Sequence, residues 1–127
     1  DEYKSIEGNP QIKGRIKQIQ QEMSRQRMMQ AVPTADVVIR NPTHVAVALK
    51  YDRDKSMAPV VVAKGVDEIA LKIVKIAEEN GIMTVENVAL ARALYAQVEL
   101  ADMIPVEFYQ AVAEIIAALY KQRNELM

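Results

Sequence analysis

The fold is decided by residues 36–51, which read DVVIRNPTHVAVALKY. Residues 36–40 and 45–51 are two runs rich in Val, Ile and Ala that are typical of β-strands. The residues between them place proline second after a polar residue, which is the usual order in a β-turn. Both faces of the second run are apolar, so we expect a central strand that is covered on both sides.

The remaining elements are predicted from shorter apolar patterns. Further strands are expected at residues 60–63, where Gly65 should end the strand, and at 82–85. Helices are expected at residues 10–30, 67–80 and 88–98, and from 104 to a polar tail that begins at 121. The third and fourth strands are joined through a helix, which favours a parallel pair with a right-handed crossover. The predicted fold class is α/β, with about four strands in one central sheet flanked by helices.

The N-terminal helix carries a narrow apolar stripe. Asn9 and Pro10 are typical of a helix start, as an N-cap acceptor followed by proline at the first helical position. The apolar residues then recur at spacings of 4, 3 and 4 residues, at Ile12, Ile16, Ile19 and Met23. So narrow a stripe cannot hold a long helix firmly on a core, and we expect its first half to project as a linker. A solvated helix that serves only as a spacer is the alternative.

Composition excludes several common kinds of site. The chain has no Cys and one His, which rules out a zinc site of the ordinary ligand type, and its four Gly stand alone, without a phosphate-binding loop. We therefore expect no cofactor and no metal. No stretch approaches the roughly 20 apolar residues that a membrane span needs. Nucleic-acid binding through residues 13–27 is disfavoured, because the net charge is −1 and this arm has no aromatic residues for stacking.

The peptide bond between Asn41 and Pro42 has unusual chemistry. Ordinary asparagine deamidation needs the N–H of the following residue, and Pro42 has none. The remaining route is attack by the side-chain nitrogen of Asn41 on its own main-chain carbonyl, which gives a succinimide and a free Pro42 amine. Thr43 is a candidate to orient the amide or to bond the developing oxyanion, and His44 is a candidate proton acceptor or a structural residue. The same dipeptide at residues 9–10 should not cleave, because its Asn side chain caps a helix.

Asn41-Pro42-Thr43-His44, followed by VAVALKY at residues 45–51, resembles the self-cleaving turn of the FlhB/YscU/SpaS family of type III secretion switch proteins. Other blocks agree in the same order along essentially the whole chain: Ala58-Pro59, VAKG at 62–65, LARALY at 90–95 and Ile104-Pro105. The run at residues 45–49 is more similar to flagellar than to virulence members.

The resemblance implies a cytoplasmic domain of the flagellar export apparatus that cleaves itself once, between Asn41 and Pro42, without turnover of an external substrate. In the family this cleavage accompanies a switch of export from rod and hook substrates to filament substrates. Residues 1–30 would then be a linker helix from a membrane domain that is absent here. Residues 31–127 would be the self-cleaving α/β domain, at the cytoplasmic face of the bacterial inner membrane.

The resemblance also implies partners and a substrate-contact patch. The expected partners are other export-gate components, the hook-length control protein, export substrates and the protein's own membrane domain, with no nucleic acid. The family's apolar patch would fall on Ala58, Pro59, Ala113 and Ile116. Two alternatives stay open, namely an uncleaved interaction module whose turn is merely structural and a virulence-system homologue.

Overall fold

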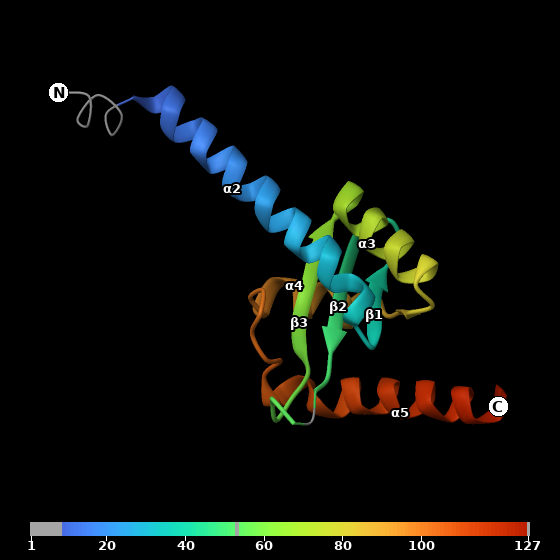
Figure 1. Cartoon of the computed structure of the whole chain (residues 1–127). Coiled ribbons are helices and arrows are strands. Elements are labelled where there is room, and N and C mark those ends of the chain that lie inside the picture. Colours follow the sequence, from blue (N-terminus) through green and yellow to red (C-terminus); the bar gives the residue numbers. More distant parts are fainter. Residues whose placement is uncertain (1–8, 53, 127) are drawn as a thin grey trace.

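A four-stranded mixed sheet forms the centre of the structure, a computed structural model that describes residues 9–52 and 54–126 (Figure 1). In order across the sheet, its strands are β3 (Val60–Val66), β2 (Val45–Lys50), β1 (Val37–Asn41) and β4 (Met83–Glu86). β2 pairs antiparallel with both β1 and β3, whereas β1 and β4 run parallel. The predicted α/β class is therefore confirmed.

Helices cover both faces of the sheet. One face is covered by the C-terminal end of α2 (Pro10–Ala31), the 3-10 turn η1 (Val32–Thr34) and α3 (Asp67–Glu79). The other face is covered by α4 (Val88–Gln97), the 3-10 turn η2 (Val106–Phe108) and α5 (Tyr109–Leu126). The sheet is thus the middle of three layers.

Alternate side chains of the central strands enter the two helical layers, as the pleat of a strand requires. Ile39 packs in the cluster formed with α4 and α5, whereas Val38 packs in the cluster that contains Met28 of α2 and Ile73 of α3. Every residue of β2 from Val45 to Leu49 is buried, which confirms the predicted central strand. The β1–β2 hairpin is therefore held on both faces and, through β3 and β4, on both edges.

Most of α2 extends away from the rest of the protein (Figure 1). Its start is capped as predicted, because Asn9 Oδ1 accepts a hydrogen bond of 2.9 Å from the N–H of Gln11. Only Met28 of this helix is buried, and Ile19 and Met23 are about half exposed. The projecting helix is confirmed, whereas its role as a linker stays a prediction.

The pairing predicted between the third and fourth strands is wrong. β2 and β1 lie between β3 and β4, and β4 pairs with β1. The outer edge of β3 is bonded instead by a later segment, since Val61 donates its N–H to Asp102 O and accepts from the N–H of Ala101. Three boundaries also differ: β3 continues through Gly65, the last helix begins at Tyr109 and not at residue 104, and it continues past residue 121 to Leu126.

Lys64 joins β3 to the end of α4. Its ammonium group donates hydrogen bonds of 2.9 Å to the carbonyl oxygens of Tyr95 and Val98 and lies 4.9 Å from the centre of the Tyr95 ring. Tyr95 lies in the last turn of α4, and Val98 is the residue that caps its C-terminus. Carbonyl groups at a helix C-terminus lack partners within the helix and carry a partial negative charge.

Lys64→Met keeps most of the aliphatic stem and removes these bonds. We expect the free energy of unfolding to fall by about 1–3 kcal/mol, as for hydrogen bonds to a charged group. Urea denaturation measures the change. Lys75→Met, which removes an exposed charge on α3, is the matched control and should unfold like the parent. Equal unfolding midpoints for the two variants would contradict the role assigned to Lys64.

Candidate self-cleavage site

The β1–β2 hairpin presents the Asn41–Pro42 bond in a strained turn. The strands pair up to the Asn41–Val45 position, and the N–H of His44 donates a hydrogen bond of 3.0 Å to the carbonyl oxygen of Asn41. Pro42 is second in this turn, and Thr43 is third with φ of 67°. Proline followed by a positive φ is the pattern of a type II turn, in which Gly usually occupies the third position.

Thr43 is a poor residue for that position. A β-branched side chain at positive φ is a genuine outlier, and such strain costs on the order of 1–3 kcal/mol. The surrounding sheet holds it there, because the residues on both sides of the turn are fixed by backbone pairing. The Thr43 hydroxyl makes no hydrogen bond to any residue within 9–52 and 54–126. The geometry therefore gives it no partner for the orienting role that the sequence suggested.

The carbonyl of Asn41 is already polarised. The His44 N–H that points at it is the kind of donor that stabilises a negatively charged oxygen as a carbonyl carbon is attacked. Asn41 and Pro42 are half-buried, whereas Thr43 and His44 are exposed. The four residues predicted for the site are thus together in one turn, and a backbone group of His44 contacts the carbonyl that the proposed reaction attacks.

Asp67 is a member of this site that the sequence did not identify. Its N–H donates a hydrogen bond of 2.9 Å to the carbonyl oxygen of His44, and its carboxylate lies 3.8 Å from His44 Nδ1. The signal that would have found it is strand register. Val45 pairs with Val66 across β2 and β3, so one further step of the same ladder brings Asp67 opposite His44.

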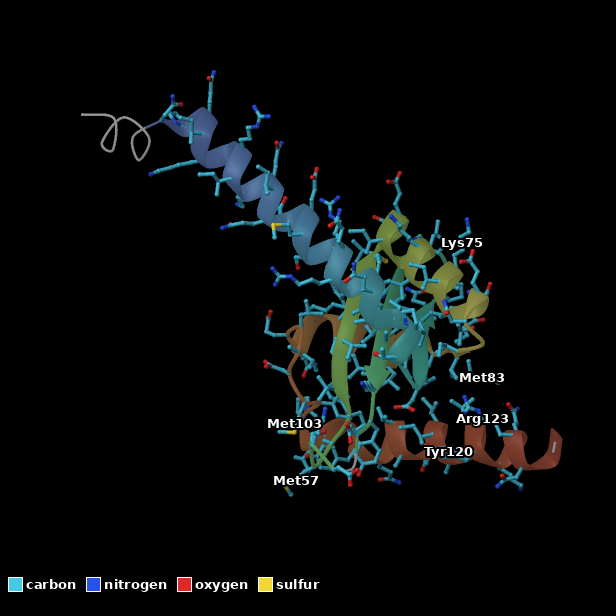
Figure 2. The ribbon with its side chains drawn as sticks, in the orientation of Figure 1. Met57, Lys75, Met83, Met103, Tyr120 and Arg123 are labelled. Carbon is cyan, nitrogen blue, oxygen red and sulfur yellow. The ribbon has the colours of Figure 1, made fainter. Side chains whose placement is uncertain are left out.

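The four residues predicted for substrate contact also come together. Ala58 and Pro59 from the β2–β3 loop and Ala113 and Ile116 from α5 line one pocket of about 340 Å³. Its remaining lining residues are mostly aromatic or aliphatic: Tyr51, Met57, Tyr109, Val112, Ala117 and Tyr120. Figure 2 shows Met57 at the tip of the loop below the start of α5 and Tyr120 farther along that helix. The pocket and the Asn41–Pro42 turn lie at opposite ends of β2.

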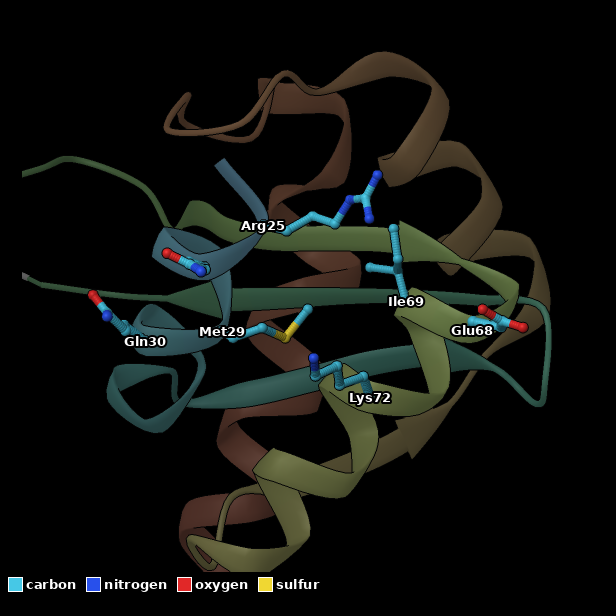
Figure 3. Close-up of a pocket in the computed structure, with 7 residues that line it drawn as sticks. Arg25, Met29, Gln30, Glu68, Ile69 and Lys72 are labelled. Atoms are coloured by element: carbon cyan, nitrogen blue, oxygen red, sulfur yellow. The ribbon is translucent and has the colours of Figure 1, made fainter. Parts of the chain in front are cut away.

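A second hollow, of about 420 Å³, separates the end of α2 from the first turns of α3. In Figure 3, Arg25 and Met29 of α2 face Ile69 and Lys72 of α3. Its lining mixes both signs of charge with apolar side chains, and it contains none of the predicted site residues.

Other classes of site find no counterpart in the described parts of the chain. No group of three or more His, Cys, Asp or Glu side chains is placed to hold a metal ion within residues 9–52 and 54–126. None of the helices described there is long and apolar enough to cross a membrane.

Comparison with known proteins identifies the family. The sequence model of the "FlhB HrpN YscU SpaS Family" matches residues 1–119. The flagellar biosynthetic protein FlhB of Bacillus subtilis is 59% identical over 126 residues, which are 99% of this chain and 35% of that protein. The chain therefore spans about a third of the length of this curated relative.

Solved structures agree with the sequence match. The crystal structure of the cytoplasmic domain of FlhB from Shewanella putrefaciens has a TM-score of 0.78 at 44% identity, covering 80% of this chain and 78% of that one. A mutated EscU C-terminal domain has a TM-score of 0.69 at 32% identity, covering 72% of this chain and 91% of that one. Sequence and fold agree, and this chain belongs to the FlhB/HrpN/YscU/SpaS family.

Proposed function

We propose that this chain is the cytoplasmic domain of a flagellar export-apparatus protein that cleaves its own backbone between Asn41 and Pro42. The observation that carries the proposal is the strained turn, in which the carbonyl of Asn41 accepts the N–H of His44 and is followed by proline. The cut would accompany a switch of export from rod and hook substrates to filament substrates. It is a single event in each molecule.

The chemistry needs no cofactor or external reactant. Asn41 Nδ2 attacks the carbon of its own main-chain carbonyl, and the bond from that carbon to the Pro42 nitrogen breaks. One proton passes from Nδ2 to the Pro42 nitrogen, so that a succinimide and a secondary amine result. The N–H of His44 bonds the oxygen as negative charge develops on it, and the imidazole of His44 carries the proton.

The required acceleration is within reach of a rigid turn. A relaxed peptide that cleaves with a rate constant of about 10⁻⁸ per second has a barrier of roughly 28 kcal/mol. A half-life near ten minutes needs a barrier of about 21 kcal/mol. Fixed near-attack geometry can supply about the 7 kcal/mol that separates them. Cleavage also releases the strain at Thr43, since its neighbour is then no longer joined to β1.

Denaturing gel electrophoresis distinguishes this function from an uncleaved interaction module. The self-cleaving chain yields fragments of residues 1–41 and 42–127. Mass spectrometry of the first fragment should show a succinimide at Asn41, or its hydrolysis product, with the side-chain nitrogen retained. One intact band after days at neutral pH would favour the uncleaved module.

The cut protein should stay folded. β1 belongs to the first fragment, yet it lies between β2 and β4 of the second, and Val37, Val38 and Ile39 are fully buried. We therefore expect the two fragments to co-elute at the size of the intact chain in gel filtration without denaturant and to separate in urea. Separate elution under native conditions would contradict this expectation.

The apolar pocket is the proposed contact for export substrates. Ala58, Pro59, Ala113 and Ile116 line it, and an apolar pocket with a few aromatic walls suits an apolar peptide segment. Other export-gate components, the hook-length control protein and the protein's own membrane domain are proposed partners, at the cytoplasmic face of the inner membrane. The 59% identity to a flagellar biosynthetic protein favours the flagellar system over a virulence system.

Ala113→Asp tests the pocket separately from the turn. A carboxylate there must lose water when an apolar peptide binds, so export of substrates in a motility complementation assay should fall at least tenfold. Self-cleavage should be unchanged, because the pocket lies at the far end of β2. Ala118→Asp, on α5 outside this pocket, is the matched control and should export normally. Equal export by both variants would remove the pocket from the proposal.

A further inference from the structure

Asp67 contacts His44, whose N–H stabilises the oxyanion and whose imidazole carries the proton in the proposed cleavage. The N–H of Asp67 bonds the carbonyl oxygen of His44 at 2.9 Å, and its Oδ1 lies 3.8 Å from His44 Nδ1. The first contact fixes the backbone that carries the His44 N–H. The second approaches one ring nitrogen and leaves Nε2 without a hydrogen bond to any residue in the described ranges.

The backbone of Asp67 is specialised for this position. It is the first residue of α3, yet its φ is 50°, in the left-handed region that Asp and Asn tolerate better than most residues. This conformation turns the chain sharply from β3 into α3, so that the same residue can present its N–H and its carboxylate to the end of the neighbouring strand. Glu68 follows directly and makes neither contact, which marks the arrangement as specific to Asp67.

We propose that Asp67 is a positioning residue for self-cleavage, a role that rests on the proposed function above. Its carboxylate orients the imidazole of His44 and favours the ring form with hydrogen on Nδ1, so that Nε2 is free to accept a proton. A carboxylate paired with one imidazole nitrogen sets which nitrogen is protonated and stabilises the imidazolium that forms. At 3.8 Å the two atoms are too far apart for a hydrogen bond, and rotation of the two exposed side chains can close that distance.

The kinetic test uses cell-free translation, which defines the time at which each chain is made, followed by denaturing gels at intervals. Asp67→Asn keeps the size and the tolerance for positive φ but removes the charge, and it should slow cleavage about two- to fivefold, the scale of an exposed ion pair. Glu68→Gln removes the same charge from the same helical turn and should cleave at the parent rate. Adding Asp67→Asn to His44→Ala should cause no further slowing, because the partner of the carboxylate is gone.

A spectroscopic test separates orientation from a merely structural role. The chain has a single His, so the nitrogen resonances of its ring are unambiguous in an NMR spectrum. In chains held uncut by Asn41→Ala, the hydrogen on Nδ1 should give way to the form with hydrogen on Nε2 when Asp67→Asn is added, and should persist with Glu68→Gln. Urea denaturation of the same variants checks that stability is retained.

The outcomes are distinct. Slowing by Asp67→Asn but not by Glu68→Gln, together with the change of ring form, supports the proposal. Cleavage of Asp67→Asn at the parent rate overturns it and leaves self-cleavage standing. Slowing of the same size in the His44→Ala background also overturns it, since the carboxylate would then act elsewhere. If the parent chain never cleaves, that result contradicts the proposed function itself.

Discussion

Asn41→Ala leaves the chain as a single band of full length on a denaturing gel. The side-chain nitrogen of Asn41 is the nucleophile, and Ala offers no replacement. The rate should therefore fall by at least about 10⁵-fold, because even a relaxed peptide that keeps the asparagine cleaves only on the scale of years. Electrophoresis at intervals up to several days measures it, and circular dichroism checks that the sheet is intact.

The chain contains a matched control for this result. Residues 9–10 repeat the Asn-Pro dipeptide, but the side chain of Asn9 is engaged with the N–H of Gln11 as a helix cap. Asn9→Ala should leave cleavage after Asn41 unchanged and weaken the start of α2 by about 1 kcal/mol. A cut after residue 9 in the parent, or a persisting cut after residue 41 in Asn41→Ala, would be incompatible with the mechanism.

Among the glycine-to-alanine substitutions possible in the described residues, Gly65→Ala should lower the free energy of unfolding most. A Cβ at Gly65 would lie 2.2 Å from Cγ2 and 2.8 Å from Cβ of Ile69, closer than real atoms approach. Rotation of Ile69 moves its Cγ2 but not its Cβ, so the backbone of α3 must shift away from β3. We expect the free energy of unfolding to fall by about 1–3 kcal/mol and the thermal midpoint by roughly 5–15 °C.

This substitution should also affect the turn, since α3 begins two residues after Gly65 and carries Asp67 against His44. Gly65→Ala should therefore slow self-cleavage as well as lower the thermal midpoint. Ile69→Ala removes the nearer of the two clashing atoms and should restore part of both losses. Gly14→Ala is the control: a Cβ there meets nothing within 4 Å, and the exposed helix should gain up to about 1 kcal/mol. Calorimetry that gave Gly65→Ala and Gly14→Ala the same midpoint would contradict the close packing.

Local patterns in the sequence identify most elements because they report local physics. The two strands around the Asn41–Pro42 turn, the cap at Asn9 and the end of the helix predicted at residues 67–80, which Gly81 follows with φ of 71°, all depend on neighbours within about four residues. Gly65 was misread for the same reason. Locally a Gly interrupts an apolar run, whereas in the fold it permits β3 and α3 to approach closely.

Strand order depends on contacts that local patterns do not record. A helix between two strands predicts that they run in the same direction, and β3 and β4 do so, since both are parallel in direction to β1. Which strands become neighbours is decided by burial. Val37, Val38 and Ile39 of β1 are buried, and β1 takes a central place in the sheet. All residues of β4 are exposed or half-buried, and β4 lies at an edge.

The sequence by itself determined which chemistry is open to this protein. The Asn-Pro dipeptide is a matter of covalent structure, and the strands that flank it follow from local patterns. Only the tertiary structure decided how that chemistry is supported. It brought Asp67 to His44 across the β2–β3 ladder and joined the loop at residues 57–59 to α5 around one apolar pocket. These pairs are separated by 23 residues or more along the chain, and packing and register, which are properties of the whole sheet, bring them together.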